Sequence, residues 1–214
     1  MRYNIELLRC SRSCDEYRRI RDRHYVPNHG AIGQQLHYLI VMDFEVIGII
    51  SGGASAYQVQ CRDDYFGINS ENRQVALNGI VDNTVFRLEK HMPNLGTQVL
   101  KMWRNRVCVD WKMKYGVNVC GFETFIIENE HRKGSMYKAD NWAFVGETKG
   151  SSKAHAHGIS NIHHRVESEK KLVFCKRVNG VDLPTVYYSN WRNQNIVRGQ
   201  ISMFEEGGLL YEQP

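Results

Sequence analysis

Three residues with chemically useful side chains stand where predicted helices and strands end. They are His24, Tyr25 and Glu128. A histidine of near-neutral pKa acts as a general base or a metal ligand, and a tyrosine orients or protonates a leaving group. A carboxylate that ends a central strand lies where sites often form. We predict a small acid–base or metal cluster from these three, with an ordinary surface histidine as the alternative for His24; the metal itself stays open between iron and zinc.

A turn over residues 93–97, before a helical pattern, is the second place suited to chemistry. The backbone N–H groups of a helix N-terminus attract anions. Asn94, Gly96 and Thr97 would then hold the anion. The turn has a single glycine, so simple capping of the helix by Asn94 or Thr97 is an equally good interpretation.

Basic and aromatic residues alternate in two further segments. The chain carries 28 Lys and Arg against 23 Asp and Glu, a formal charge of +5. A modest positive balance fits a nucleic acid or another phosphate-bearing partner without requiring one. Mixed aromatic and basic side chains support base stacking and backbone contact. We therefore predict the following nucleic-acid-binding residues: Arg62, Tyr65, Arg73, Lys149 and Lys153.

Histidines and cysteines give no complete metal motif. The histidine-rich run consists of His155, His157, His163 and His164. It stands among Gly, Ser and Lys, which favours a surface loop over a divalent-ion site. Of the six cysteines, Cys10 and Cys14 form one close pair and the others stand alone, so no zinc set is complete.

The hydrophobic pattern predicts the elements that position these residues. We expect strands over residues 2–8, 37–42, 46–50, 80–88, 117–127, 142–146 and 171–178, and helices over 15–25, 95–115 and around 135–138. Residues 51–55 are expected to be a flexible tail of the second hairpin strand, and 61–74 a polar loop. Such alternation indicates an α/β (α+β) domain with a mixed central sheet flanked by helices, and the order fits an N-acetyltransferase fold.

The length and apolar content suffice for one core, so we expect one domain over residues 1–180 and a C-terminal extension over 181–214. The first residues do not form a signal peptide, and no run approaches the roughly 18 apolar residues of a membrane span. We expect a cytoplasmic protein of a bacterial host cell with reduced thiols and no membrane contact. The oligomeric state is not predictable from the sequence.

One segment resembles a known family. Residues 133–150 read KGSMYKADNWAFVGETKG, which resembles the signature of the DruA-like proteins known from Druantia anti-phage systems and some transposon-associated proteins. Shorter pieces agree in order, at 24–38, 62–67, 82–83, 93–97 and 123–125. The chain departs from the pattern with Asp82 for asparagine, Thr97 for serine and Glu128 for aspartate. A shorter version of the signature resembles Mom, a phage protein that hypermodifies adenine in DNA.

Both resemblances imply a GNAT-like N-acetyltransferase fold. They imply a site role for Tyr137, near a thioester, where a core aromatic packed on Trp142 is the alternative. They also imply acetyl-CoA or another acyl or aminoacyl donor near the 93–97 turn. The function so implied is a Mom-like transferase, encoded by a bacteriophage or mobile element, whose modification of DNA, with adenine as the expected base, gives anti-restriction protection. Two alternatives stay open: a non-catalytic DruA-like DNA-binding component of a defence or transposon system, and an acyl-CoA-dependent N-acyltransferase on a small amine or protein.

Overall fold

A computed structural model gives the structure of the protein. It describes residues 3–26, 33–149, 151–153, 165–167 and 169–184. The chain divides into a unit over residues 1–184 and a second unit over 185–214, and the second lies outside the described residues. The expected extension over 181–214 therefore stays a prediction, as does the histidine run at 155–164.

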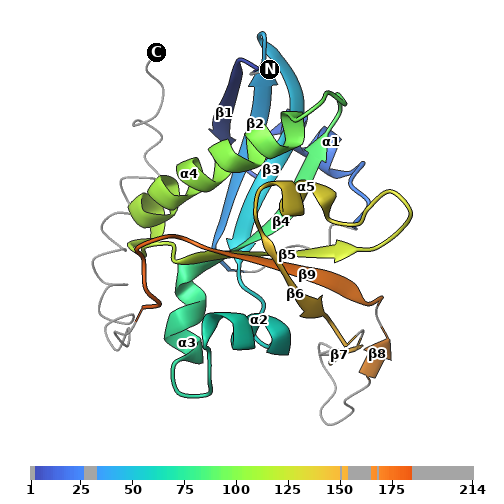
Figure 1. Ribbon diagram of the computed structural model, residues 1–214. Coiled ribbons are helices and arrows are strands. Elements are labelled where there is room, and N and C mark those ends of the chain that lie inside the picture. Colours follow the sequence, from blue (N-terminus) through green and yellow to red (C-terminus); the bar gives the residue numbers. More distant parts are fainter. Residues whose placement is uncertain (1–2, 27–32, 150, 154–164, 168, 185–214) are drawn as a thin grey trace, which may run out of the picture. The chain divides into compact units, whose positions relative to one another are not determined.

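A seven-stranded mixed sheet forms the centre of the unit, in the order β1-β2-β3-β4-β5-β9-β6 (Figure 1). Its strands are β1 (Ile5–Cys10), β2 (Gln35–Met42), β3 (Glu45–Ala54), β4 (Ile80–Leu88), β5 (Gly121–Ile127), β6 (Ala143–Glu147) and β9 (Lys171–Arg177). β4 and β5 run parallel, whereas the other neighbouring pairs of this sheet are antiparallel. A separate pair consists of β7 (Ser151–Lys153) and β8 (Arg165–Glu167). The predicted mixed α/β class is confirmed.

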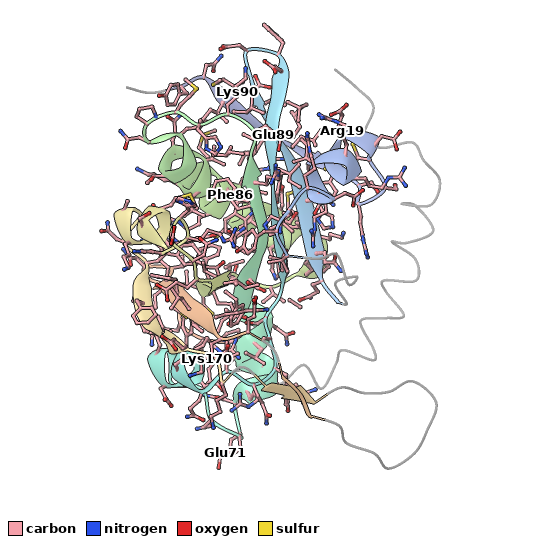
Figure 2. All side chains as sticks on the ribbon, turned by 90° about the vertical axis from the view of Figure 1, so that its right-hand side faces the viewer. Arg19, Glu71, Phe86, Glu89, Lys90 and Lys170 are labelled. Carbon is pink, nitrogen blue, oxygen red and sulfur yellow. The ribbon has the colours of Figure 1, made fainter. Side chains whose placement is uncertain are left out.

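Helices cover both faces of the sheet. They are α1 (Asp15–Arg21), α2 (Gln60–Phe66), α3 (Arg73–Ala76), α4 (Leu95–Tyr115) and α5 (Ser135–Ala139), with a 3-10 turn at Leu77–Gly79. Neighbouring side chains of a strand point to opposite faces. Accordingly, Tyr38 donates a hydrogen bond to Asp110 of α4, while Leu39 packs with Tyr17 and Ile20 of α1. Figure 2 shows α1 with Arg19 on one side of the sheet and α4 and α5 on the other.

The long helix α4 ends where the sequence predicts. Its apolar residues recur with helical spacing and are buried, among them Leu95, Val99, Trp103 and Val107. Gly116 ends the helix with φ 72°, in the left-handed conformation that glycine adopts without strain. The predicted hairpin over 37–50 is also confirmed; its two-residue turn has positive φ at both central positions.

Several predicted bounds were wrong. The expected loop over 61–74 contains α2 and α3, because Phe66 and Val75 are buried and hold short helices against the core. The expected flexible tail 51–55 is largely the end of β3, which pairs with β2 on one side and β4 on the other. The first helix ends at Arg21 rather than at residue 25. The strand predicted from 117 begins at Gly121.

None of the helices in the described part of the chain has the length and apolar character that a membrane crossing needs.

Candidate functional site

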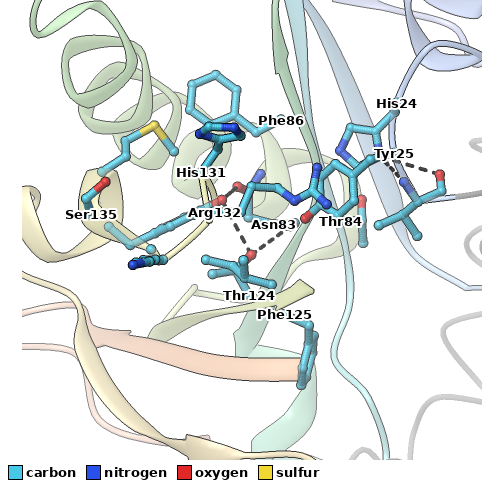
Figure 3. Close-up of a pocket in the computed structure, with 16 residues that line it drawn as sticks. His24, Tyr25, Asn83, Thr84, Phe86, Thr124, Phe125, His131, Arg132 and Ser135 are labelled. Carbon is cyan, nitrogen blue, oxygen red and sulfur yellow. Dashed lines mark hydrogen bonds between the residues drawn. The ribbon is translucent and has the colours of Figure 1, made fainter. Parts of the chain in front are cut away.

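The two parallel strands β4 and β5 separate shortly after they begin. They pair at three positions only, Ile80 with Gly121, Val81 with Phe122 and Asp82 with Glu123. Beyond this point lies a cavity of about 200 Å³ (Figure 3). Its lining residues are His24, Tyr25, Val26, Asn83, Thr84, Phe86, Thr124, Phe125, Ile126, His131, Arg132, Lys133, Gly134, Ser135, Met136 and Tyr137. We call it the strand cavity.

A β-bulge shapes the β4 wall of the strand cavity. Ser51 pairs with Val85 and Gly53 with Asp82, so Gly52 faces both Asn83 and Thr84. The Asn83 side-chain amide replaces the disturbed strand pairing, because its Nδ2 donates to Ser51 O at 3.0 Å and to Val85 O at 3.2 Å. Bulges of this kind redirect side chains beside sites. Here the bulge fixes Asn83 Oδ1 as an acceptor.

Tyr137 supplies the donor for that acceptor. Its hydroxyl donates to Asn83 Oδ1 at 2.7 Å and lies 3.5 Å from Thr124 Oγ1. The ring packs at 5.1 Å on Trp142 and is 7% exposed. Burial raises the pKa of the Tyr137 hydroxyl, so it stays protonated at neutral pH. The two interpretations of Tyr137 are thus compatible: the ring is a core aromatic and its hydroxyl reaches the cavity wall.

His24 is a neutral hydrogen-bond donor in this structure. Its Nδ1 lies 3.2 Å from the Val26 N–H, which can only donate, so Nδ1 accepts. Burial, together with the positive charge of Arg21, lowers the pKa of His24 to about 4. At neutral pH the single ring proton is therefore on Nε2. The ring lies 4.5 Å from that of Tyr25.

The rim of the strand cavity is cationic. Arg132 places its guanidinium 4.0 Å from the ring centre of Tyr25, and its Nε donates to Ile127 O at 3.3 Å. His131 and Lys133 flank it and are exposed. Neither Asp nor Glu occurs among the described residues that line the cavity. The sequence analysis missed this rim, although a run of three basic residues just after the strongest strand was a usable signal.

The predicted cluster of His24, Tyr25, Glu128 and Tyr137 comes together only in part. His24, Tyr25 and Tyr137 line the strand cavity, whereas Glu128 is exposed and does not line it. β5 ends at Ile127, and the Asn129 side chain then accepts the N–H groups of His131 and Arg132, which starts a turn away from the strand direction. The expectation that Glu128 joins the cluster does not fit this geometry.

A second cavity of about 420 Å³ lies at the N-terminus of α4. It is lined by Leu88, Lys90, His91, Met92, Asn94, Gly96, Thr97, Ser135, Met136 and Ala139. All three residues predicted to bind an anion are among them. The Asn94 side chain makes no capping hydrogen bond, and the N–H groups of Gly96 and Thr97 have no partner within the described chain. We call this the helix cavity; it shares Ser135 and Met136 with the strand cavity.

Gly96 keeps the helix cavity in its shape. A Cβ at this position would lie 2.6 Å from the Met136 sulfur. A larger residue would therefore displace the Met136 side chain at the boundary of the two cavities.

Arg62 was predicted to contact nucleic acid, and this prediction was wrong. Its side chain is fully buried, and Nη1 contacts Glu123 Oε2 at 2.6 Å while Nε contacts Asp63 Oδ1 at 2.7 Å. Arg73 pairs with Asp63 and is mostly buried too. The motif residues Arg62 and Glu123 are thus an ion pair between α2 and β5. A basic residue beside an acidic one in a half-apolar helix was the signal for such a pair.

The other predicted nucleic-acid contacts are less constrained. Tyr65 is half-buried, with the Arg177 guanidinium 5.3 Å from its ring centre. Lys149 is exposed. The side chain of Lys153 lies outside the described residues. Neither cavity is lined by Arg62, Tyr65, Arg73 or Lys149, and the roles of Tyr65, Lys149 and Lys153 stay predictions.

Asp82 adds a second acid beside this ion pair. It stands directly opposite Glu123 in the β4–β5 register, and its Oδ1 is buried without a hydrogen-bond partner. Burial and the nearby Glu123 raise the pKa of Asp82 well above its usual value. Within the described residues, no group of three or more His, Cys, Asp or Glu has the arrangement of a metal site.

These features define a class of protein. A mixed sheet covered on both faces, a long helix after β4 and a cavity where β4 and β5 separate are the parts of the predicted N-acetyltransferase-like fold. The chain matches the family described as Druantia protein DruA over residues 2–177. It belongs to the DruA family.

Solved structures similar to the chain are acetyltransferases. N-acetyltransferase PseH of Campylobacter jejuni is 8% identical over 68% of this chain and 70% of its own, with a TM-score of 0.40. The Salmonella typhimurium enzyme that modifies the N-terminal serine of ribosomal protein L7/L12 is 10% identical over 69% and 66%, with a TM-score of 0.41. At this distance the likeness does not bear on the reaction. No curated protein sequence matches the chain.

Proposed function

We propose that the protein is a transferase that modifies a nucleobase in DNA, adenine first, and so protects the DNA of a phage or mobile element from restriction. The observation that carries the proposal is the strand cavity, which combines aromatic walls with a cationic rim and has no carboxylate among its described lining residues. The chain's DruA family membership and its resemblance to Mom agree with DNA as the target.

The charge of the strand cavity separates kinds of amine substrate. A lysine or an aminoglycoside enters as an ammonium ion, which Arg132 and Lys133 repel and no carboxylate in the lining attracts. The exocyclic amine of a nucleobase is uncharged at neutral pH. A base is also planar, so it stacks on aromatic walls such as Phe86 and Phe125, provided that it leaves the duplex stack.

The helix cavity fits the acyl donor that the fold implies. The N–H groups of Gly96 and Thr97 are available to an anion at the N-terminus of a 21-residue helix, where the helix dipole favours negative charge. The absent side chain at Gly96 leaves the room that such a group needs. When bound there, an acyl thioester supplies an activated carbonyl carbon. The shared residues Ser135 and Met136 place the two cavities next to each other.

The residues of the strand cavity orient and polarise the base rather than deprotonate it. His24 offers Nε2–H as a donor to a ring nitrogen or carbonyl of the base. Tyr137 is held protonated by burial and its hydroxyl is fixed by its hydrogen bond to Asn83, so it places a neutral polar group at the cavity wall. The amine of a base is uncharged before it reacts, so no ammonium proton has to be removed from it first, and the low basicity of His24 is compatible with this substrate.

Nucleoside profiling tests the proposal. DNA is digested from cells that express the wild-type protein or the H24A/Y137F double variant, and the nucleosides are separated and weighed by mass spectrometry. We expect a new modified nucleoside with the wild type and none with the variant. The proposal would be wrong if the wild-type protein is folded but its DNA stays unmodified in cells, and also stays unmodified in a lysate to which acyl-CoA donors are added.

A second candidate is a non-catalytic DNA-recognition component of an anti-phage or transposon system. The observation that favours it is that His24 is a poor general base, because its Nδ1 lies in a hydrogen bond with the Val26 backbone and its pKa is about 4. This candidate predicts DNA binding without any new nucleoside. A thermal shift with acetyl-CoA separates the two, since a bound donor stabilises the fold by mass action and a pure DNA binder shows no shift.

A further inference from the structure

The loop between β5 and α5 presents three consecutive basic side chains in a fixed turn. Asn129 Oδ1 accepts the N–H of His131 at 3.0 Å and of Arg132 at 2.8 Å, and the backbones of Asn129 and Arg132 also bond to each other. Arg132 Nε donates to Ile127 O at the strand end. The loop therefore holds its charges at the rim of the strand cavity.

The positive charge of this rim is not neutralised within the described chain. His131, Arg132 and Lys133 form no ion pair there. Two nearby arginines differ, because Arg23 and Arg87 both pair with Glu89. The terminal nitrogens of Arg132 make no hydrogen bond among the described residues, and its guanidinium carbon lies 4.0 Å from the ring centre of Tyr25. The rim offers a guanidinium, an ammonium group and an imidazole to a ligand.

The size of the strand cavity limits what enters it. About 200 Å³ is below the roughly 300–1,000 Å³ of common ligand pockets. Only part of a nucleotide fits inside. With a base between the aromatic walls, the sugar and phosphate stay outside, at the level of the loop. An arginine and a lysine with unpaired charge are the usual ligands of a phosphate.

We infer that Arg132 and Lys133 bind the phosphate that flanks the base in the strand cavity, so that the ligand is a nucleotide of an unpaired DNA segment rather than a free nucleoside. This inference rests on the proposed function for the identity of the base, but the phosphate contact is separable from the chemistry. It also assigns nucleic-acid contact to residues other than the five that the sequence pattern indicated.

Fluorescence anisotropy of a labelled single-stranded oligonucleotide tests the inference. Binding is measured at several salt concentrations for the wild type, for R132Q/K133Q, and for K101Q/K112Q. The last variant removes the same charge from exposed positions of α4 outside both cavities. For single strands each phosphate contact contributes about 0.7 to the slope of log K against log salt. Loss of the contact to this one phosphate should reduce the slope by about 0.7 and weaken binding about tenfold or more, whereas the control should keep the wild-type slope.

A competition experiment tests whether the phosphate of the nucleotide is needed for binding. Together with nucleoside profiling, it also separates failure of the phosphate site from failure of the transferase proposal. A deoxynucleoside 5′-monophosphate should displace the oligonucleotide at concentrations where the deoxynucleoside does not. Equal slopes for R132Q/K133Q and K101Q/K112Q, with both variants folded by circular dichroism, would overturn the inference. If R132Q/K133Q loses binding but the wild type makes no modified nucleoside, the phosphate site stands and the transferase proposal falls.

Discussion

Adjacent residues of β5 belong to two different regions, the buried ion pair of Arg62 with Glu123 and the strand cavity. Glu123 is fully buried, and its carboxylate accepts hydrogen bonds from Arg62, Ser55 and the Ala56 backbone. Thr124, the next residue, lines the strand cavity, whose rim carries unpaired cations. In the first region the carboxylate is buried and hydrogen-bonded. The second region is an open cavity whose rim offers hydrogen-bond donors to a ligand. A short sequence motif that spans both thus mixes structural and site residues, and only their surroundings separate them.

The signature over 133–150 shows the same division. Gly134 has φ 70°, and a Cβ there would lie 2.4 Å from Phe174. Asp140 is buried and accepts from both Arg104 and the Trp142 indole. Asn141 takes the left-handed conformation, with φ 58°. These residues fold the segment, whereas the hydroxyl of Tyr137 reaches the cavity. A family motif therefore does not by itself identify catalytic residues.

The largest expected effect is on the buried ion pair. Arg62→Met leaves Glu123 buried without its cation, and removal of one partner of such a pair typically costs about 3–5 kcal/mol of unfolding free energy. Arg132→Met at the cavity rim is the matched control and should change stability by less than about 0.5 kcal/mol. Urea denaturation measures both. Similar losses for the two variants would break the comparison.

Tyr137→Phe should have an intermediate effect. It removes the donor to Asn83 Oδ1 and leaves that buried oxygen unpaired, which costs about 1–3 kcal/mol. Tyr57→Phe, at a side chain that is 64% exposed, is the control and should be neutral. Thermal unfolding of the two variants checks this. A neutral Tyr137→Phe would mean that the hydroxyl is not held by Asn83.

Asp82→Asn should sharpen the comparison through pH. Because the folded pKa of Asp82 is raised, the fold binds a proton that the unfolded chain releases near its usual pKa of about 4. Wild-type stability should therefore fall as pH rises from about 4 toward the folded pKa. The asparagine variant has no such proton to lose. The unfolding free energy of the variant minus that of the wild type should therefore be more favourable at pH 8 than at pH 4, by on the order of 1 kcal/mol. Urea melts at both pH values measure it; parallel curves would contradict a protonated Asp82.

The smallest expected effect concerns His24. Its folded pKa of about 4 lies below the usual 6.5, so the neutral form stabilises the fold above pH 6.5, and this contribution is lost as pH falls toward 4. His24→Gln should lessen the loss of stability over that range by roughly 1 kcal/mol or less, since a half-buried group is partly screened. The pKa of His37 is also lowered to about 4, so the H37Q variant is measured in the same way to separate the contributions of the two histidines to the pH dependence of stability.

Local patterns predicted the regular elements better than the site. The spacing from Leu95 to Val107 and the glycine at 116 determine α4, and Tyr137, for which the resemblance implied a site role, lines the strand cavity. The sequence did not reveal that Arg62 is buried, because its partner Glu123 is 61 residues away. The run of basic residues that forms the cationic rim is visible in the sequence, but its contact with Tyr25, through Arg132, joins residues that are far apart along the chain.

Photo-crosslinking tests most directly whether the strand cavity, rather than the α2–α3 region, receives DNA. A single-stranded oligonucleotide with a photoreactive base is irradiated with the wild-type protein, and the crosslinked peptides are identified by mass spectrometry. The account predicts crosslinks to the cavity walls, at Tyr25, Phe86 or Phe125. Crosslinks confined to residues 57–74, with the cavity walls unlabelled, would contradict it.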